Sequence, residues 1–144
     1  MFKKLFITAA FALLTLTPQT AKAEEAQKQA ISKSMTECTV IFQVYGLMAK
    51  NQGKSEEMIG YFDKAAARFR DAAVTRAEAE GIADPKQHIS DTYNELLPKW
   101  QEKYTAITKG SMVEMTTETK DIMDWVNYCG SLGRKIKILP LSEE

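Results

Sequence analysis

Apolar residues recur at steps of three and four along most of this chain, a spacing that places them on one face of an α-helix. Gly, Pro, Ser and Asp separate four such series at short intervals. The pattern predicts an all-α domain of four amphipathic helices. The predicted apolar faces comprise Ile31, Met35, Cys38, Phe42, Tyr45 and Met48 in the first helix; Met58, Phe62, Ala65, Phe69, Ala72 and Ala73 in the second; Ile89, Tyr93, Leu96, Trp100, Tyr104 and Ile107 in the third; and Met115, Ile122, Trp125, Val126, Cys129 and Leu132 in the fourth.

Residues with helix-capping side chains mark the expected helix starts. The stretch 34–37 fits a capping box, in which a Ser and a Glu three residues later satisfy each other's backbone amides, so the first helix is expected to begin at Met35. Residues 24–33 also permit helix, which leaves this start open. The other expected caps are Ser55, Asp84 followed by Pro85, and a second box over residues 111–114. The expected ends lie at Gly53, Gly81, Gly110 and Gly133.

Short links between amphipathic helices favour antiparallel neighbours, so the predicted fold is an up-down-up-down four-helix bundle. Pro98 lies inside the third helix and removes a backbone hydrogen bond there, so we expect a kink between Asn94 and Pro98, with a break into two helices as the alternative. Residues 134–141 are expected to form an extended tail whose Ile136, Ile138 and Leu141 pack on the bundle.

The N-terminus has the pattern of a cleaved Sec-type signal peptide. Lys3 and Lys4 precede a twelve-residue apolar run over residues 5–16, and Ala21-Lys22-Ala23 fits a small-x-small cleavage site. A helix needs about 20 residues to span a bilayer, so this run is too short to do so. We therefore expect residues 1–23 to be removed and residues 24–144 to form a single domain, periplasmic or secreted, with no transmembrane segment; an uncleaved N-terminal anchor is the alternative.

The two cysteines are predicted to form a structural disulfide. Cys38 lies on the apolar face near the start of the first helix, and Cys129 lies on the apolar face near the end of the fourth. An antiparallel bundle places these two helix ends side by side, and an exported protein folds where thiols become oxidised. A redox-active pair would more often show a CxxC motif at a helix start, which this sequence lacks.

Composition narrows the classes of partner. Removing Lys3, Lys4 and Lys22 with the signal segment would lower the formal charge from 0 to about −3. A mildly acidic domain is a poor match for nucleic acid, for which a basic surface is expected. The expected partner is therefore an unidentified protein or small molecule in the cell envelope.

Motifs for catalysis and for cofactor binding are missing. The chain has one histidine, His88, and no GxSxG, HExxH or glycine-rich phosphate loop. We therefore expect that the protein is not an enzyme. It also lacks CxxCH, which excludes covalent haem; an axial pair for non-covalent haem would have to combine His88 with a methionine. Met112, Met115 and Met123 could supply sulfur ligands for Cu(I), but packing in the core is the expected role. No cofactor or metal is therefore predicted.

Four aromatic residues give the main indication of a binding site. Trp100 and Tyr104 lie on the third predicted helix, and Trp125 and Tyr128 lie on the fourth. Aromatic side chains with a polar atom often line ligand or partner sites, so these four are the candidate groove if the two helices pack together. The sequence thus predicts an exported, non-catalytic binding or interaction protein. The alternative is a carrier of a small ligand, non-covalent haem or metal in the bundle core.

Overall fold

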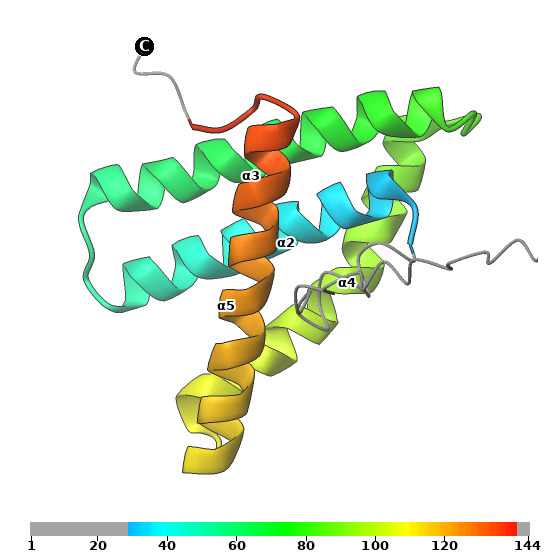
Figure 1. The fold of residues 1–144 in the computed structure, drawn as a ribbon. Coiled ribbons are helices and arrows are strands. Elements are labelled where there is room, and N and C mark those ends of the chain that lie inside the picture. Colours follow the sequence, from blue (N-terminus) through cyan, green and yellow to red (C-terminus); the bar gives the residue numbers. More distant parts are fainter. Residues whose placement is uncertain (1–28, 141–144) are drawn as a thin grey trace, which may run out of the picture.

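The computed structural model describes residues 29–140, and within them it consists of helices joined by short turns. The helices are α2 (Ile31–Asn51), α3 (Glu56–Ala79), α4 (Pro85–Lys109) and α5 (Met112–Lys135). Figure 1 shows two antiparallel hairpins, α2–α3 and α4–α5, the second lying across the first. The predicted all-α, four-helix fold is confirmed, with an up-and-down chain order in two crossed pairs. The expected signal segment, residues 1–23, lies outside the described residues.

Three helix starts confirm the sequence prediction. The Ser55 side chain accepts a hydrogen bond from the Met58 amide, and the Asp84 side chain accepts one from the Gln87 amide. Ser111 and Glu114 form a complete capping box at the start of α5. These caps satisfy amides that have no partner within the helix, so nearby residues suffice to specify them.

The start of α2 corrects the prediction of a capping box at Ser34. The helix begins at Ile31, and its N-cap residue, Ala30, provides no side-chain hydrogen bond. The cap comes from a different helix: the Glu80 carboxylate, directly after α3, accepts hydrogen bonds from the amide and the hydroxyl of Ser32. This is possible because the end of α3 lies beside the start of α2 in the antiparallel hairpin.

The end of α5 corrects the predicted stop at Gly133. The helix continues to Lys135, and Gly133 is buried within it. A Cβ atom at Gly133 would lie 2.6 Å from Cδ1 of Leu139, so the glycine lets the following segment fold back against the helix. The reversal occurs at Lys137, whose φ is 63°, and the Gly133 carbonyl accepts the amides of Ile138 and Leu139.

Helix α2 is the central element because it packs against α3, α4 and α5. Between Ser34 and Phe42 it is buried on all sides, so it carries polar as well as apolar buried residues. The hydroxyls of Thr36 and Thr39 donate to the carbonyls of Ser32 and Met35 one turn earlier. These bonds satisfy buried groups that would otherwise be costly.

The predicted disulfide is confirmed. Cys38 of α2 and Cys129 of α5 are bonded, with their Cα atoms 5.5 Å apart and both side chains fully buried. The bond joins α2 of the first hairpin to α5 of the second. A disulfide is consistent with an extracellular or other oxidising compartment.

Helix α4 continues through Pro98 without a break, so the alternative of two shorter helices is excluded. The kink expected at this proline stays a prediction. None of the helices described is long and apolar enough to cross a bilayer.

Candidate functional site

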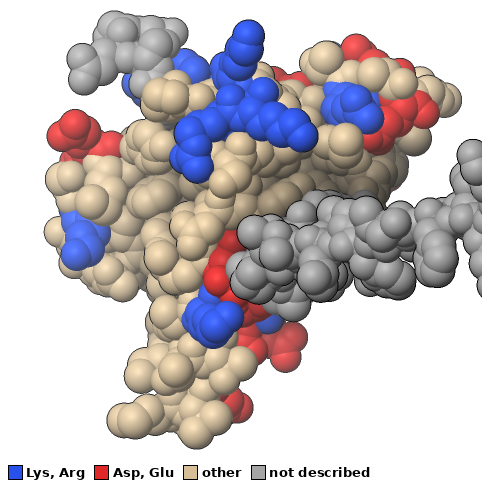
Figure 2. Space-filling view, in the orientation of Figure 1, with Lys and Arg blue, Asp and Glu red and all other residues tan. Residues whose placement is uncertain are grey.

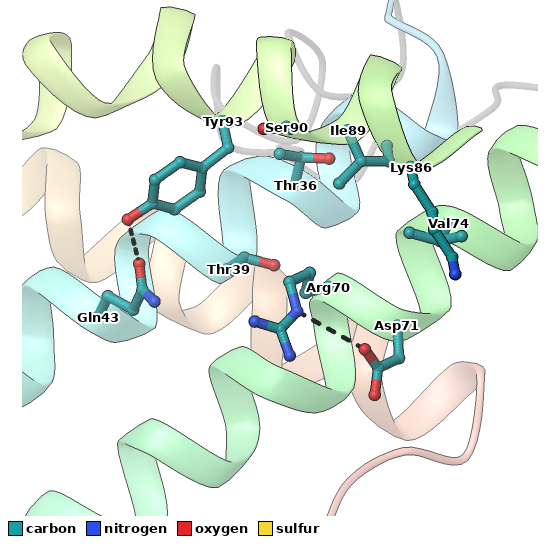
Figure 3. A pocket seen from close by; sticks show the side chains of 10 residues that line it. All are labelled: Thr36, Thr39, Gln43, Arg70, Asp71, Val74, Lys86, Ile89, Ser90 and Tyr93. Carbon is teal, nitrogen blue, oxygen red and sulfur yellow. Dashed lines mark hydrogen bonds and ion pairs between the residues drawn. The ribbon is translucent and has the colours of Figure 1, made fainter. Parts of the chain in front are cut away.

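A hollow with a volume of about 490 Å³ lies between α2, α3 and α4 (Figure 3). We call it the polar groove. Thr36, Thr39 and Gln43 line it from α2, at helical steps of three and four. Cavities of about 300–1,000 Å³ are typical of sites for small organic molecules.

The floor of the polar groove combines apolar surface with hydroxyl oxygens. Ile89 of α4 is buried and Val74 of α3 is half-buried, and both line the groove. Thr36 and Thr39 use their hydroxyl hydrogens for bonds within α2, which leaves their oxygen atoms as acceptors. A bound molecule would therefore meet an apolar surface together with two acceptors at the floor.

Tyr93 and Gln43 close one end of the polar groove. The Tyr93 hydroxyl donates a hydrogen bond to Oε1 of Gln43, which joins α4 to α2 (Figure 3). Burial raises the pKa of Tyr93 above its usual value of 10.0, so the hydroxyl keeps its proton at neutral pH. Because Oε1 is already an acceptor, the two hydrogens on the Gln43 amide nitrogen are the donors that this residue can offer.

The rim of the polar groove carries two basic residues and one acid. Arg70 Nε lies 3.6 Å from Oδ1 of Asp71, but these side chains are 60% and 76% exposed. An ion pair this exposed contributes little energy and is easily exchanged for another partner. Lys86 has no acid as partner among the residues described, and Figure 3 shows its side chain extending toward Val74.

These features favour a ligand of a particular chemistry. The two cations outweigh the single carboxylate, and Arg70 in particular can bind carboxylates and phosphates through paired donors. The floor and the Tyr93 ring offer apolar contact. The polar groove therefore suits a small molecule with one anionic group and an apolar body.

The four aromatic residues predicted as a groove lie elsewhere. Trp100 and Trp125 are fully buried and pack edge to face with ring centroids 5.9 Å apart. Tyr128 packs edge to face on Trp125, whereas Tyr104 lies apart and accepts a hydrogen bond from Asn51. The structure thus brings three of the four together: the two tryptophans lie in the core, and Tyr128 packs half-buried against it. Ligand binding there would require the two indoles to separate, so this site stays an untested prediction.

A buried polar network surrounds these tryptophans, and the sequence analysis did not identify it. Glu37 is 2% exposed, and its Oε1 accepts hydrogen bonds from Lys99 Nζ at 2.9 Å and Trp100 Nε1 at 3.1 Å. The Lys99 ammonium also lies 5.2 Å from the Trp100 ring centroid. The carboxylate is paired and the indole is satisfied, which is typical of a structural network.

Two acidic residues of α5 pair with a lysine of α4. Glu118 and Asp121 each lie 2.7 Å from Lys103 Nζ. Burial alone would lower the pKa of Lys103, but the two carboxylates outweigh it and hold that pKa above its usual value. This cluster links the two helices of the α4–α5 hairpin.

The methionines weighed as core residues or copper ligands are exposed. Met112 is 78% exposed and Met115 is 40% exposed at the turn between α4 and α5, so the expectation that they pack in the core is wrong. Met123 accepts a hydrogen bond from Tyr45. In residues 29–140, no group of three or more His, Cys, Asp or Glu side chains is placed to hold a metal ion.

The sequence analysis also missed the residues of the polar groove. One signal was present: Thr36, Thr39 and Gln43 form a polar series at helical spacing beside the apolar face of their helix. Arg70 and Lys86 show no comparable local pattern. Comparison with known proteins finds no family model that matches the chain, and no similar curated protein or solved structure.

Proposed function

We propose that this chain is an exported, non-catalytic binding protein that holds a small anionic molecule with an apolar body in the polar groove. The observation that carries the proposal is the pairing of Arg70 and Lys86 at the rim with the apolar surface of Val74 and Ile89 beneath. Export is supported by the signal-like N-terminus, and the buried disulfide fits an oxidising compartment.

A non-catalytic role fits the chemistry of the groove. Its lining includes neither the histidine nor either cysteine of the chain. Tyr93 is held neutral, and its hydroxyl hydrogen is used in the bond to Gln43. Groups that bind and orient a ligand are therefore better represented than groups that would transfer a proton or attack a bond.

A pair of fluorescent probes tests the proposal. The probe 8-anilinonaphthalene-1-sulfonate has an aromatic body and one anionic group, and N-phenyl-1-naphthylamine has nearly the same body without the charge. We expect saturable binding of the sulfonate at one site and weaker binding of the neutral amine. Amide chemical shifts of Thr39, Gln43 and Tyr93 would locate the probe in the polar groove.

Charge-removing variants give the control. Replacing both Arg70 and Lys86 by Gln should weaken binding of the sulfonate by about ten-fold and leave binding of the neutral amine unchanged, because only the anion loses its partners. Lys50 and Lys109 are exposed and lie outside the groove, so replacing both by Gln removes the same charge elsewhere. Equal losses in the two double variants, or shifts confined to other residues, would reject the polar groove as the site.

A further inference from the structure

A second hollow, on a different side of the bundle, combines aromatic walls with a basic side chain, Arg134, that has no ion pair among the described residues. It lies between α3, α5 and the segment after α5, and its volume is about 370 Å³. Tyr61 and Phe62 contribute from α3, Val126 and Arg134 from α5, and Pro140 from the segment beyond, with Phe42 of α2 at the base. We call it the basic cleft.

The apolar part of the basic cleft is a recess with aromatic walls that pack on one another. Phe42 stacks on Phe62 with ring centroids 6.2 Å apart, and Tyr61 meets Phe62 edge to face at 5.8 Å. Tyr61 remains 40% exposed, so one face of this aromatic group is open to a partner. A recess of this kind accepts a single inserted apolar side chain.

The opposite wall is fixed in place by contacts of the segment after α5. Arg68 Nη1 donates to the Ile138 carbonyl at 3.3 Å, and Leu139 packs on Gly133. These contacts hold Pro140 at the edge of the recess. The cleft is therefore formed before any partner arrives, which lowers the entropic cost of binding.

Basic residues lie in the basic cleft and on the elements that form it, and none has an acidic partner among the residues that the structure describes. Arg134 lines it, and its guanidinium bonds only the Ser131 hydroxyl among the residues described. Lys64 precedes Arg68 by one turn on α3, and Lys135 and Lys137 follow Arg134; none of them has an ion pair in the part of the chain described. Figure 2 shows basic side chains gathered over the end of α5 and the adjoining part of α3.

From this juxtaposition we infer that the basic cleft binds an acidic peptide segment of a partner protein, with one aromatic or large aliphatic side chain in the recess and flanking carboxylates on Arg134 and its neighbours. Charge complementarity selects an acidic partner. A membrane surface fits less well, because membrane-binding surfaces present projecting apolar side chains whereas this apolar surface is recessed. The inference is independent of the polar groove, which has other lining residues.

Fluorescence anisotropy with a defined peptide tests the inference. The probe is a dye-labelled nine-residue peptide with one central tryptophan and two glutamates on each side. We expect saturable binding that weakens with added salt, and a loss of at least about ten-fold when the glutamates become glutamines or the tryptophan becomes alanine. An affinity that stays the same after both peptide changes, glutamate to glutamine and tryptophan to alanine, would overturn the inference.

Protein variants locate the site. Replacing Arg134 and Lys137 by Gln should weaken peptide binding by about ten-fold, and Tyr61→Ser should do so without changing the charge. The variant with Lys50 and Lys109 replaced by Gln removes two exposed charges away from the cleft and should bind as the parent does. Far-ultraviolet circular dichroism checks that each variant is folded.

Vesicles of phosphatidylcholine with phosphatidylglycerol distinguish the membrane alternative. The inference requires binding to the acidic peptide and little sedimentation with these vesicles. Sedimentation with anionic vesicles together with no saturable peptide binding would assign the basic residues to a lipid surface and overturn the proposal. An equal loss of peptide binding in the Lys50 and Lys109 variant would also overturn it, because net charge alone would then explain the affinity.

Discussion

The carboxylate of Glu80 caps a helix to which it does not belong. Its Oε2 accepts the Ser32 hydroxyl, and its Oε1 accepts both the Ser32 amide at 3.3 Å and Arg76 Nε at 3.0 Å. Because Ala30 offers no cap, this carboxylate supplies the acceptor and the negative charge that a helix N-terminus favours. The contact also joins the start of α2 to the end of α3.

Removing the charge of Glu80 should destabilise the fold and change its response to acid. Burial raises the pKa of Glu80, but the hydrogen bonds from Ser32 and Arg76 outweigh burial and place it below the usual 4.5. A lowered folded-state pKa contributes stability above the usual pKa, and this contribution is lost as pH falls through the folded value. We expect Glu80→Gln to cost about 1 kcal/mol at pH 7, with a smaller difference at pH 3.

Urea unfolding at both pH values measures this effect. Glu78→Gln is the matched control, because Glu78 is exposed and two residues away from Glu80. A Glu80→Gln penalty that is as large at pH 3 as at pH 7 would contradict the role assigned to the charge.

The sequence predicted those features of the fold that depend on neighbouring residues. The caps at Ser55, Asp84 and Ser111 are local hydrogen bonds, and the pattern located each of them. The apolar spacing also placed Cys38 and Cys129 on faces that meet.

The wrong predictions arose where a distant residue determines the role of a local one. Ser34 and Glu37 have the spacing of a capping box, yet Glu37 is needed in the core beside Lys99 and Trp100, and Glu80 caps the helix instead. The polar groove was missed for the same reason: its residues come from three helices, so no single segment carries its pattern.

The two buried tryptophans should respond differently to loss of the indole nitrogen. Trp100 Nε1 donates to Glu37, whereas Trp125 Nε1 is buried and has no hydrogen-bond partner among the residues described. Trp100→Phe removes a donor from a buried carboxylate, which costs about 1–3 kcal/mol beyond the lost volume. Trp125→Phe removes a similar volume together with an unsatisfied donor, so its penalty should be smaller.

Chemical denaturation of the two tryptophan variants gives the comparison, and each serves as the volume control for the other. Adding Glu37→Leu, which removes the acceptor, to each variant completes the test, because only the Trp100 pair should show coupling. Equal penalties for the two single variants would show that the bond to Glu37 has no net value.

Reduction of the disulfide should lower stability substantially. The bond joins residues separated by 91 positions, and the loop-entropy model gives about 4.5 kcal/mol for a loop of this length. We expect the free energy of unfolding, measured in urea, to fall by about this amount in the reduced protein. The double variant with Cys38→Ala and Cys129→Ala should show a loss of the same size. Reductant should leave the double variant unchanged, and alkylation of the unreduced protein should modify neither cysteine.

Replacement by alanine should lower the stability of the fold at one glycine of α5 and raise it at another. At Gly133 a Cβ would lie 2.6 Å from Leu139, so Gly133→Ala forces this segment away and should cost about 1–3 kcal/mol. At Gly130 the nearest atom is a flexible Arg134 nitrogen at 3.5 Å, so Gly130→Ala should stabilise the helix by up to about 1 kcal/mol.

Thermal and urea unfolding of the two alanine variants check the signs, and shortening Leu139 identifies the cause. If the clash with Leu139 produces the penalty, Gly133→Ala should cost much less in a Leu139→Ala background than in the parent. Since Leu139 helps to hold Pro140 at the basic cleft, Gly133→Ala should also weaken binding of the acidic peptide. Gly130→Ala should not destabilise the fold. A penalty at Gly133 that persists without the Leu139 side chain would mean that the helix itself, rather than this packing contact, requires the glycine.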